Sequence, residues 1–238
     1  MGADAYAPRN TIPAFELAIS MGVDGVELDV NRSADDAVVV IHDQTIDNTS
    51  NGKGRVDHMT LKQLRQYDYS YKFKDKYKNV TIPTLEEVCQ LIKPTNLFID
   101  VEIKGTSELY KGIEHQLIDI AKKTGMLDRM IFSSFDVKYL INILKIEPSA
   151  FCAMIHDKDI EKPWDIVKSI PVKSNHPPFQ MVDENYIENC HSRGFKVITW
   201  TVDDPLDIRR MPELGVDGII TNRPDVGLHE RENYMQNR

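Results

Sequence analysis

Short apolar runs alternate with amphipathic segments along the whole chain, and this alternation limits the possible folds more than any other feature of the sequence. Most of the runs are rich in Val, Ile and Phe and lack strict polar alternation, which is typical of strands buried on both faces of a parallel sheet. The pattern therefore predicts an α/β fold. The predicted strands are residues 25–30, 38–42, 97–103, 130–134, 151–155, 171–175, 196–202 and 218–221.

The predicted helices lie between these strands. Their starts are marked by polar capping residues, and their ends by glycines that accept the left-handed conformation. Both signals mark the helix over residues 12–21, between Thr11 and Gly22, and the helix over residues 184–193, between Asp183 and Gly194. A third helix begins at Asp204 and Pro205 and ends at Gly215. Thr84 and Asp136 are predicted as two further caps.

The chain length of 238 residues suits a single TIM-type (β/α)8 barrel, a fold that needs about 250 residues. The sequence Gly-Val-Asp-Gly-Val at residues 22–26 recurs as Gly-Val-Asp-Gly-Ile at residues 215–219, each time between a predicted helix and a predicted strand. A repeated turn near both ends favours one closed barrel domain over residues 1–238. A doubly wound open sheet is the alternative.

Charge and cysteine content exclude several classes of protein. Acidic residues outnumber basic ones by 37 to 29, and the net charge of −8 argues against nucleic acid as the main partner. Cys89, Cys152 and Cys190 form neither a disulfide framework nor a metal-binding pair. No stretch approaches the roughly 18 apolar residues of a membrane span, and no signal peptide precedes the fold. A cytoplasmic protein without a membrane anchor is therefore expected.

Residues 43–83 differ from the rest of the chain and are predicted to form an insertion within the barrel. They contain few apolar runs and a turn at residues 51–54. Insertions of this length beside a strand end usually form a loop or a small subdomain near the functional site. Residues 67–74 read Tyr-Asp-Tyr-Ser-Tyr-Lys-Phe-Lys and end in an alternation of aromatic residues with lysine. Three interpretations of this segment stay open: a substrate lid, a membrane-touching patch, or a local aromatic cluster with solvated lysines.

Carboxylates recur at alternate positions of two predicted strands. Glu27 and Asp29 share one face of the first strand, and Asp100, Glu102 and Lys104 share one face of another. Acidic side chains in apolar strands are costly to bury unless they are paired or bind metal. Their convergence at a barrel mouth predicts a site for a hard cation such as Mg²⁺ or Ca²⁺, with Lys104 facing an anionic substrate. A buried ion-pair network that uses Lys104 is the alternative.

His42 ends an apolar run and is followed by Asp43, so its side chain is well placed for proton transfer near neutral pH. Taken alone, a structural histidine is the simpler interpretation, and the neighbouring carboxylate site favours catalysis. Trp200 lies in a predicted strand and is either a core residue or a substrate-facing wall. The sequence contains no nucleophile elbow, P-loop or dinucleotide-binding glycine motif.

Several motifs resemble those of the glycerophosphodiester phosphodiesterase family in order and spacing, and the resemblance covers nearly the whole chain. The motifs are Ala-Tyr-Ala-Pro-Arg-Asn-Thr at residues 5–11, Val-Glu-Leu-Asp-Val at 26–30, Val-Ile-His-Asp at 40–43, Ile-Pro-Thr-Leu-Glu-Glu at 82–87, Val-Glu-Ile-Lys at 101–104, Thr-Trp-Thr-Val at 199–202 and the segment 215–225, which ends in Asn-Arg-Pro-Asp.

The resemblance implies a TIM barrel hydrolase of glycerol and lipid metabolism that converts glycerophosphodiesters to sn-glycerol 3-phosphate and an alcohol. A phospholipase C-like or lysophospholipase D-like activity on lipid substrates is a neighbouring alternative. The implied site residues are Glu27, Asp29 and Glu102 as ligands of a divalent cation, Lys104 near the phosphate, Trp200 near the substrate, and His42 as one of two catalytic histidines.

The second histidine of the family belongs to a His-Arg-Gly motif at the end of the first barrel strand. Gly2 aligns with the glycine of that motif, so Met1 occupies the arginine position, and the histidine and the first strand would precede the printed sequence. Arg9 and Asn48 replace a glutamate and an arginine of the family pattern.

The strand count bears on this alignment. The link over residues 31–37 is too short for the crossover between parallel neighbours, so residues 38–42 are predicted to form an antiparallel hairpin partner or spur. A barrel would then need the strand that is absent from the printed sequence.

These departures lead to three hypotheses. The first is a metal-dependent phosphodiesterase whose printed sequence lacks its natural N-terminus. The second is a degenerate relative that binds phosphodiesters or metal without turnover, since loss of one acid–base partner typically lowers the rate by about 10²–10⁴-fold. The third is a structural or interaction domain built on an inherited barrel.

Overall fold

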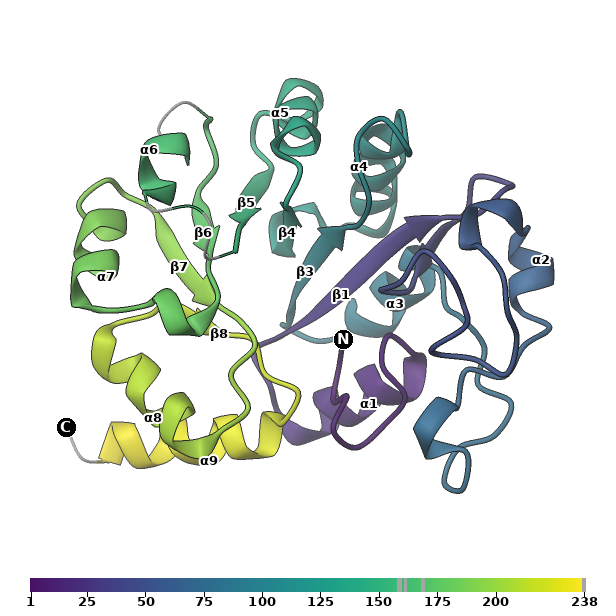
Figure 1. Cartoon of the computed structure of the whole chain (residues 1–238), viewed down its shortest axis with the longest axis horizontal. Coiled ribbons are helices and arrows are strands. Elements are labelled where there is room, and N and C mark those ends of the chain that lie inside the picture. The colour runs from purple at the N-terminus through teal and green to yellow at the C-terminus, as the bar shows by residue number, and fades with distance from the viewer. Residues whose placement is uncertain (158–159, 161, 168–169, 237–238) are drawn as a thin grey trace.

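A single curled sheet of eight strands forms the centre of the protein, and most of the helices surround it (Figure 1). The computed structural model describes residues 1–157, 160, 162–167 and 170–236. The strand order is β2-β1-β3-β4-β5-β6-β7-β8, with β2 antiparallel to β1 and every other neighbouring pair parallel. The strands are β1 Gly25–Arg32, β2 Val38–Val40, β3 Phe98–Ile103, β4 Met130–Ser134, β5 Phe151–Ile155, β6 Ser174–His176, β7 Lys196–Thr199 and β8 Gly218–Ile219.

The helices follow the strands in the manner expected of an α/β barrel. They are α1 Ile12–Met21, α2 Leu61–Leu64, α3 Leu85–Ile92, α4 Ile113–Thr124, α5 Val137–Ile146, α6 Pro163–Val167, α7 Glu184–His191, α8 Pro205–Leu214 and α9 Pro224–Gln236, with short 3₁₀ turns η1 Val56–His58, η2 Tyr71–Phe73, η3 Leu127–Arg129 and η4 Phe179–Met181. Within the residues that the structure describes, no helix combines the length and apolar character needed to cross a bilayer.

The curled sheet is a half-barrel, because β1 and β8 are not paired with each other among the described residues. The segment before α1 lies between them. The Ala5 N–H donates to the carbonyl of Asn222, which follows β8, at 3.1 Å, and the Met1 ammonium contacts the carbonyl of Glu27 in β1. The predicted TIM-type α/β architecture is therefore confirmed, in an open form whose gap is spanned by the N-terminal segment.

Most strand predictions are close to the observed bounds. The strands at residues 130–134 and 151–155 are confirmed at both ends, and the antiparallel pairing of residues 38–40 with β1 is confirmed by the register Val30↔Val40. The prediction of a strand over residues 171–175 is wrong at its start, because β6 begins at Ser174. Pro171 has no N–H to donate to a neighbouring strand, which makes it unsuited to a central ladder.

The capping predictions for Thr84, Asp136, Asp183 and Asp204 are confirmed, since each side chain accepts a backbone N–H of the first helical turn. The cap predicted at Thr11 is wrong. Its hydroxyl donates to the carbonyl of Pro8 at 2.5 Å instead and makes no capping bond to α1. The local turn therefore uses the hydroxyl that the helix start would otherwise use.

Thr84 and Glu87 form a reciprocal capping box at the start of α3, whose apolar face packs into the main core. Thr84→Ala is expected to lower the free energy of unfolding by about 1 kcal/mol, because one helical N–H loses its acceptor. For a chain of this size that corresponds to a melting temperature lower by about 2–4 °C. Thr84→Ser keeps the hydroxyl and is the control. Equal thermal denaturation curves for the Ala and Ser variants would contradict a contribution from the cap.

Two apolar clusters meet at β2. Val38 and Val40 face the main core between the sheet and its helices, whereas Val39 and Ile41 face a second, smaller cluster. Alternate side chains of a strand point to opposite faces, so one short strand can contribute to both clusters. The remaining members of the second cluster come from residues 43–83 and are Ile46, Val56, Leu64, Tyr69, Val80 and Ile82. This second cluster fixes the segment 43–83 to β2. His42 therefore lies at the boundary between β2 and that segment.

Candidate active site

Three carboxylates from two neighbouring strands lie close together inside the half-barrel. β1 and β3 are parallel, with Glu27 opposite Asp100 and Asp29 opposite Glu102, so these side chains project to the same face. Glu27, Asp29 and Glu102 each offer one oxygen, and the three oxygens lie within 4.8 Å of one another. The spacing of two residues within each strand and the register between the strands together produce this cluster.

Two positive groups contact the cluster. The Lys104 Nζ lies 2.9 Å from an Asp29 oxygen and 2.5 Å from a Glu102 oxygen, and the Met1 ammonium contacts the Glu27 carboxylate. Lys104 is itself largely buried, and the charges of Asp29 and Glu102 outweigh the effect of burial and raise its pKa. Lys104 therefore forms the ion pairs of the network that was the alternative to a metal site, with one lysine shared between two carboxylates.

The carboxylates in this cluster differ in how strongly they hold a proton. Burial raises the pKa of Glu27 to about 7, and burial together with the charge of Asp29 raises the pKa of Glu102 to about 8. Burial also acts on Asp29, but the positive charges of Lys104 and the Met1 ammonium lower its pKa overall. Three carboxylates therefore lie beside two positive groups, and a bound cation would favour the charged forms of Glu27 and Glu102.

Asn10 orients Asp29 from the turn before α1. The Asn10 Nδ2 donates to an Asp29 oxygen at 2.7 Å, and the Asn10 Oδ1 accepts the Asp29 backbone N–H at 3.3 Å. Asn10 has φ +56°, a left-handed conformation that Asn tolerates better than most residues. Sequence reasoning gave Asn10 no role, since its contact depends on a turn conformation and on a partner nineteen positions away. Its place in the motif at residues 5–11 was the available signal.

His42 follows β2, and its side chain is 41% exposed. Its Nδ1 lies 2.8 Å from an Asp43 oxygen, and Asn48 Nδ2 donates to the other Asp43 oxygen at 3.0 Å. Burial opposes ionisation of Asp43, but the bonds from His42 and Asn48 lower its pKa overall. Because Nδ1 faces Asp43, Nε2 is the ring nitrogen that can face a substrate. Asn31 of β1 also holds this turn, donating to the carbonyl of Ile41 at 2.7 Å.

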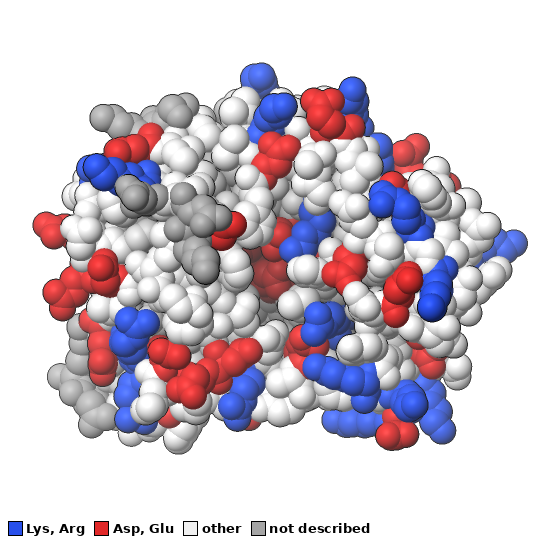
Figure 2. All heavy atoms as spheres, in the orientation of Figure 1, with Lys and Arg blue, Asp and Glu red and all other residues white. Residues whose placement is uncertain are grey.

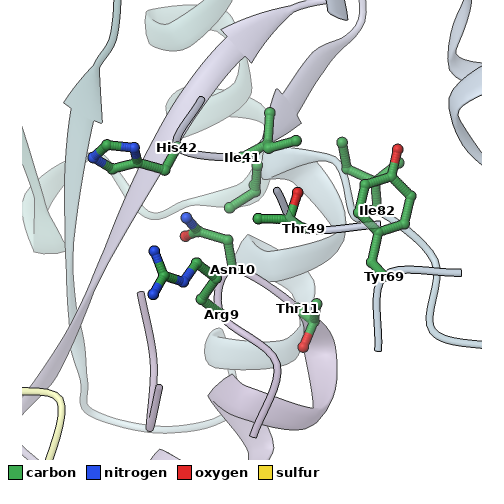
Figure 3. Close-up of a pocket in the computed structure, with 9 residues that line it drawn as sticks. Arg9, Asn10, Thr11, Ile41, His42, Thr49, Tyr69 and Ile82 are labelled. Carbon is green, nitrogen blue, oxygen red and sulfur yellow. The ribbon is translucent and has the colours of Figure 1, made fainter. Parts of the chain in front are cut away.

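Arg9 and His42 line the same pocket. Figure 3 shows the His42 ring and the Arg9 guanidinium extending to one side of the pocket, with the Asn10 amide between them. Arg9 lies 3.1 Å from an oxygen of the buried Asp4, and Lys72 lies 3.8 Å from the other Asp4 oxygen. Arg9, which departs from the family pattern, is thus held by the buried Asp4 and lines the pocket together with His42.

Asp100 lies outside the three-carboxylate cluster, although it shares a strand face with Glu102. Ser133 donates to one Asp100 oxygen at 2.6 Å, and His176 Nδ1 lies 3.3 Å from the other. Burial raises the pKa of Asp100 to about 7 and lowers the pKa of His176 to about 3. The expectation that Asp100 joins the convergent carboxylates is wrong, because its position two residues earlier on β3 directs it toward β4 and β6.

Trp200 lies just after β7 and is partly exposed. Its Nε1 donates to the carbonyl of His176 at 2.8 Å, which fixes the ring plane. The ring of Phe135, which is 49% exposed and follows β4, meets it edge to face with centroids 6.0 Å apart. These two rings form an apolar edge at the carboxyl ends of the strands, where barrel enzymes bind their substrates.

Comparison with known proteins agrees with this arrangement. The sequence profile of the glycerophosphoryl diester phosphodiesterase family matches residues 1–226. A glycerophosphodiester phosphodiesterase from Caldanaerobacter subterraneus subsp. tengcongensis is 38% identical over 224 residues, which are 94% of this chain and 92% of the relative.

Two solved structures extend the comparison to the fold. The structure of an Agrobacterium tumefaciens glycerophosphodiester phosphodiesterase matches with a TM-score of 0.83 at 27% identity over 96% of each chain. An Oleispira antarctica phosphodiesterase, solved in complex with the product sn-glycerol-3-phosphate, matches with a TM-score of 0.92 at 23% identity and covers 97% of this chain and 94% of its own.

Proposed function

The chain belongs to the glycerophosphoryl diester phosphodiesterase family, and on this basis we propose that it hydrolyses glycerophosphodiesters to sn-glycerol 3-phosphate and an alcohol with a bound divalent cation. The family match and the relative at 38% identity identify it as an enzyme of the phosphodiesterase class. The observation that carries the proposal is the approach of Glu27, Asp29 and Glu102 oxygens to within 4.8 Å, beside His42 at the end of β2.

The residues present fit a hard divalent cation such as Mg²⁺ or Ca²⁺. Both ions prefer oxygen ligands, and Glu27, Asp29 and Glu102 supply carboxylate oxygens from two rigid strands. Burial raises the pKa values of Glu27 and Glu102, with a contribution from the neighbouring carboxylates, and a bound cation would favour the charged forms of both side chains. When bound, a divalent cation would stabilise the charge that develops on the phosphoryl oxygens.

The other residues have separate roles in the proposed reaction. Lys104 contributes a buried positive charge to the same cluster, suited to attract the phosphate group of the substrate. In the hydrolysis, an oxygen–phosphorus bond forms from water, the bond to the alcohol oxygen breaks, and a proton passes from water to the departing alcohol. His42 is the proposed proton carrier through Nε2, and Asp43 sets the orientation of its ring. Trp200 and Phe135 offer an apolar surface to the carbon skeleton.

Two measurements on the purified chain test the proposal. The first follows release of sn-glycerol 3-phosphate from sn-glycero-3-phosphocholine, with Mg²⁺ or Ca²⁺ added to metal-depleted protein. The second measures binding of the metal and of the phosphodiester by titration calorimetry. Metal-dependent product release supports the proposal. Binding of metal and phosphodiester without product would favour the binding-only relative, and a melting temperature that does not respond to either metal would favour a purely structural domain.

Metal affinity is expected to rise with pH between about 6 and 8, because protons compete for the carboxylates whose pKa values are raised to about 7 in Glu27 and about 8 in Glu102. Protonated carboxyl groups must lose their protons before they bind a cation, so each displaced proton changes the apparent affinity by up to about tenfold per pH unit. Calorimetry in two buffers of different ionisation enthalpy measures the released protons. An affinity that is constant over this range would contradict the proposed ligand set.

A further inference from the structure

Residues 71–78, which we call the lysine–aromatic segment, form an exposed basic patch in an acidic protein. The segment reads Tyr-Lys-Phe-Lys-Asp-Lys-Tyr-Lys, so four lysines and one aspartate give it a charge of +3 (4 − 1), against −8 for the whole chain. All four lysines are exposed, as is Tyr71 at 46%. The segment includes the 3₁₀ turn η2 and forms the loop at the lower right of Figure 1.

Hydrogen bonds between the residues that flank the lysine–aromatic segment hold the two ends of the loop together. The Tyr69 N–H donates to the carbonyl of Val80 at 2.8 Å, and both residues are buried in the second apolar cluster. Asp68 accepts the N–H groups of Ser70 and Val80 at 2.9 and 3.0 Å. The loop is therefore anchored at both ends as a compact surface loop of the kind that often carries a binding function.

Within the loop, aromatic rings and ammonium groups are interleaved. The Lys72 Nζ lies 5.2 Å from the centre of the Phe73 ring, and the Lys76 Nζ lies 5.2 Å from that of Tyr77. The Phe73 and Tyr77 rings meet edge to face at 6.3 Å. Tyr71 has φ +46°, an unusual conformation for a bulky residue, and is 46% exposed. The loop thus combines cations with one phenylalanine and with two tyrosines, whose side chains have both an apolar body and a polar end.

The loop lies on the same face of the protein as the carboxylate cluster. Lys72 faces Asp4, which also binds Arg9, and Arg9 lines the pocket with His42. Figure 2 shows basic side chains gathered at the lower right of this face and an acidic hollow near its centre, where Figure 1 marks the N-terminus. The Met1 ammonium at that terminus contacts Glu27, so the hollow lies at the candidate active site.

We propose that the lysine–aromatic segment docks the protein on an anionic phospholipid surface, with the candidate active site turned toward the lipid. Clustered lysines are attracted to anionic headgroups, and aromatic side chains with a polar end are favoured at the boundary between headgroups and acyl chains. Single-stranded nucleic acid also binds to cations interleaved with aromatic rings, and the test below distinguishes it from the lipid surface. The proposal concerns binding and holds independently of the hydrolysis proposed above.

Vesicle binding tests the proposal. The full chain is co-sedimented with vesicles of phosphatidylcholine alone and of phosphatidylcholine with phosphatidylglycerol, at low and at high salt. We expect binding to the anionic vesicles only, and loss of that binding at high salt because ions screen the attraction. Equal partition to both kinds of vesicle, or no binding to either, would overturn the proposal.

Matched charge reversals locate the surface. Each lysine near an anionic membrane contributes about fivefold to binding, so the triple variant Lys74→Glu, Lys76→Glu and Lys78→Glu is expected to bind at least about 100-fold more weakly. The control reverses Lys93, Lys123 and Lys173, which are exposed at the opposite end of the barrel, before β3, β4 and β6. The control changes the net charge equally and is expected to retain binding.

Three readouts separate docking from other causes. Thermal melts confirm that both triple variants fold, and metal titrations confirm that the carboxylate cluster is intact. Tyr71→Ser is expected to weaken vesicle binding severalfold without changing its salt dependence, because it removes a ring and no charge.

Equal loss of binding in both triple variants would overturn the proposal. Tighter binding to single-stranded RNA than to anionic vesicles would overturn it in favour of a nucleic-acid surface.

Discussion

Glu102→Gln is expected to abolish metal binding and to lower the rate of phosphodiester hydrolysis by about 10³-fold. The substitution keeps the shape of the side chain but removes one of three carboxylates, and it frees Lys104 to pair with Asp29 alone. Loss of the cation would remove several kcal/mol of charge stabilisation at the phosphoryl group, and each 1.36 kcal/mol is about tenfold in rate. Calorimetric metal titration and release of sn-glycerol 3-phosphate measure the two effects.

The fold should survive this substitution. Burial disfavours the charged form of Glu102 and raises its pKa to about 8, so a neutral amide is not expected to lower the melting temperature of the metal-free protein. Glu108→Gln is the matched control, because Glu108 is exposed in the loop that follows β3 and lies outside the cluster. Full metal affinity in the Glu102 variant, or equal losses in both variants, would contradict the assignment of Glu102 as a ligand.

His42→Asn is expected to lower kcat by about 10²–10⁴-fold while leaving metal affinity nearly unchanged, because it removes a proton carrier and not a ligand. The variant keeps a polar side chain that can still face Asp43, so the local turn should persist. Rate measurements over a range of pH at saturating metal separate the two roles, since loss of an acid–base group removes one limb of the pH profile.

His58→Asn is the control for this prediction. His58 is exposed and lies in the turn η1 of residues 43–83, the segment that follows His42. Its substitution is expected to leave the rate unchanged. If the His42 variant retained the wild-type rate and pH profile, His42 would be a structural residue and the proton would be carried by another group.

The carboxylate cluster was within reach of sequence reasoning because two local rules determine it. Glu27 and Asp29 are two residues apart, and so are Asp100 and Glu102, which places each pair on one face of an apolar strand. The remaining step was the register between two strands whose paired residues are 73 positions apart in sequence. That step decides why Asp29 meets Glu102 and why Asp100 lies deeper, against Ser133 and His176.

The supporting residues could not be predicted in the same way. Asn10 reaches Asp29 only because its backbone is left-handed, and Asn31 reaches the turn at His42 only because β2 folds back on β1. The contact of Thr11 was equally hard to predict, because the hydroxyl of a threonine before a helix can bond either to the helix start or to the preceding turn, as it does here. Contacts of this kind depend on three-dimensional proximity and have no periodic signal in the sequence.

The two faces of β2 determine which parts of this fold can vary in sequence without disturbing the candidate active site. Val38 and Val40 pack in the main core between the sheet and its helices, and Val39 and Ile41 pack in the second cluster, so each cluster is filled by its own side chains. Changes in the exposed loops of residues 43–83 are therefore expected to leave the position of His42 relative to the three carboxylates of the cluster unchanged.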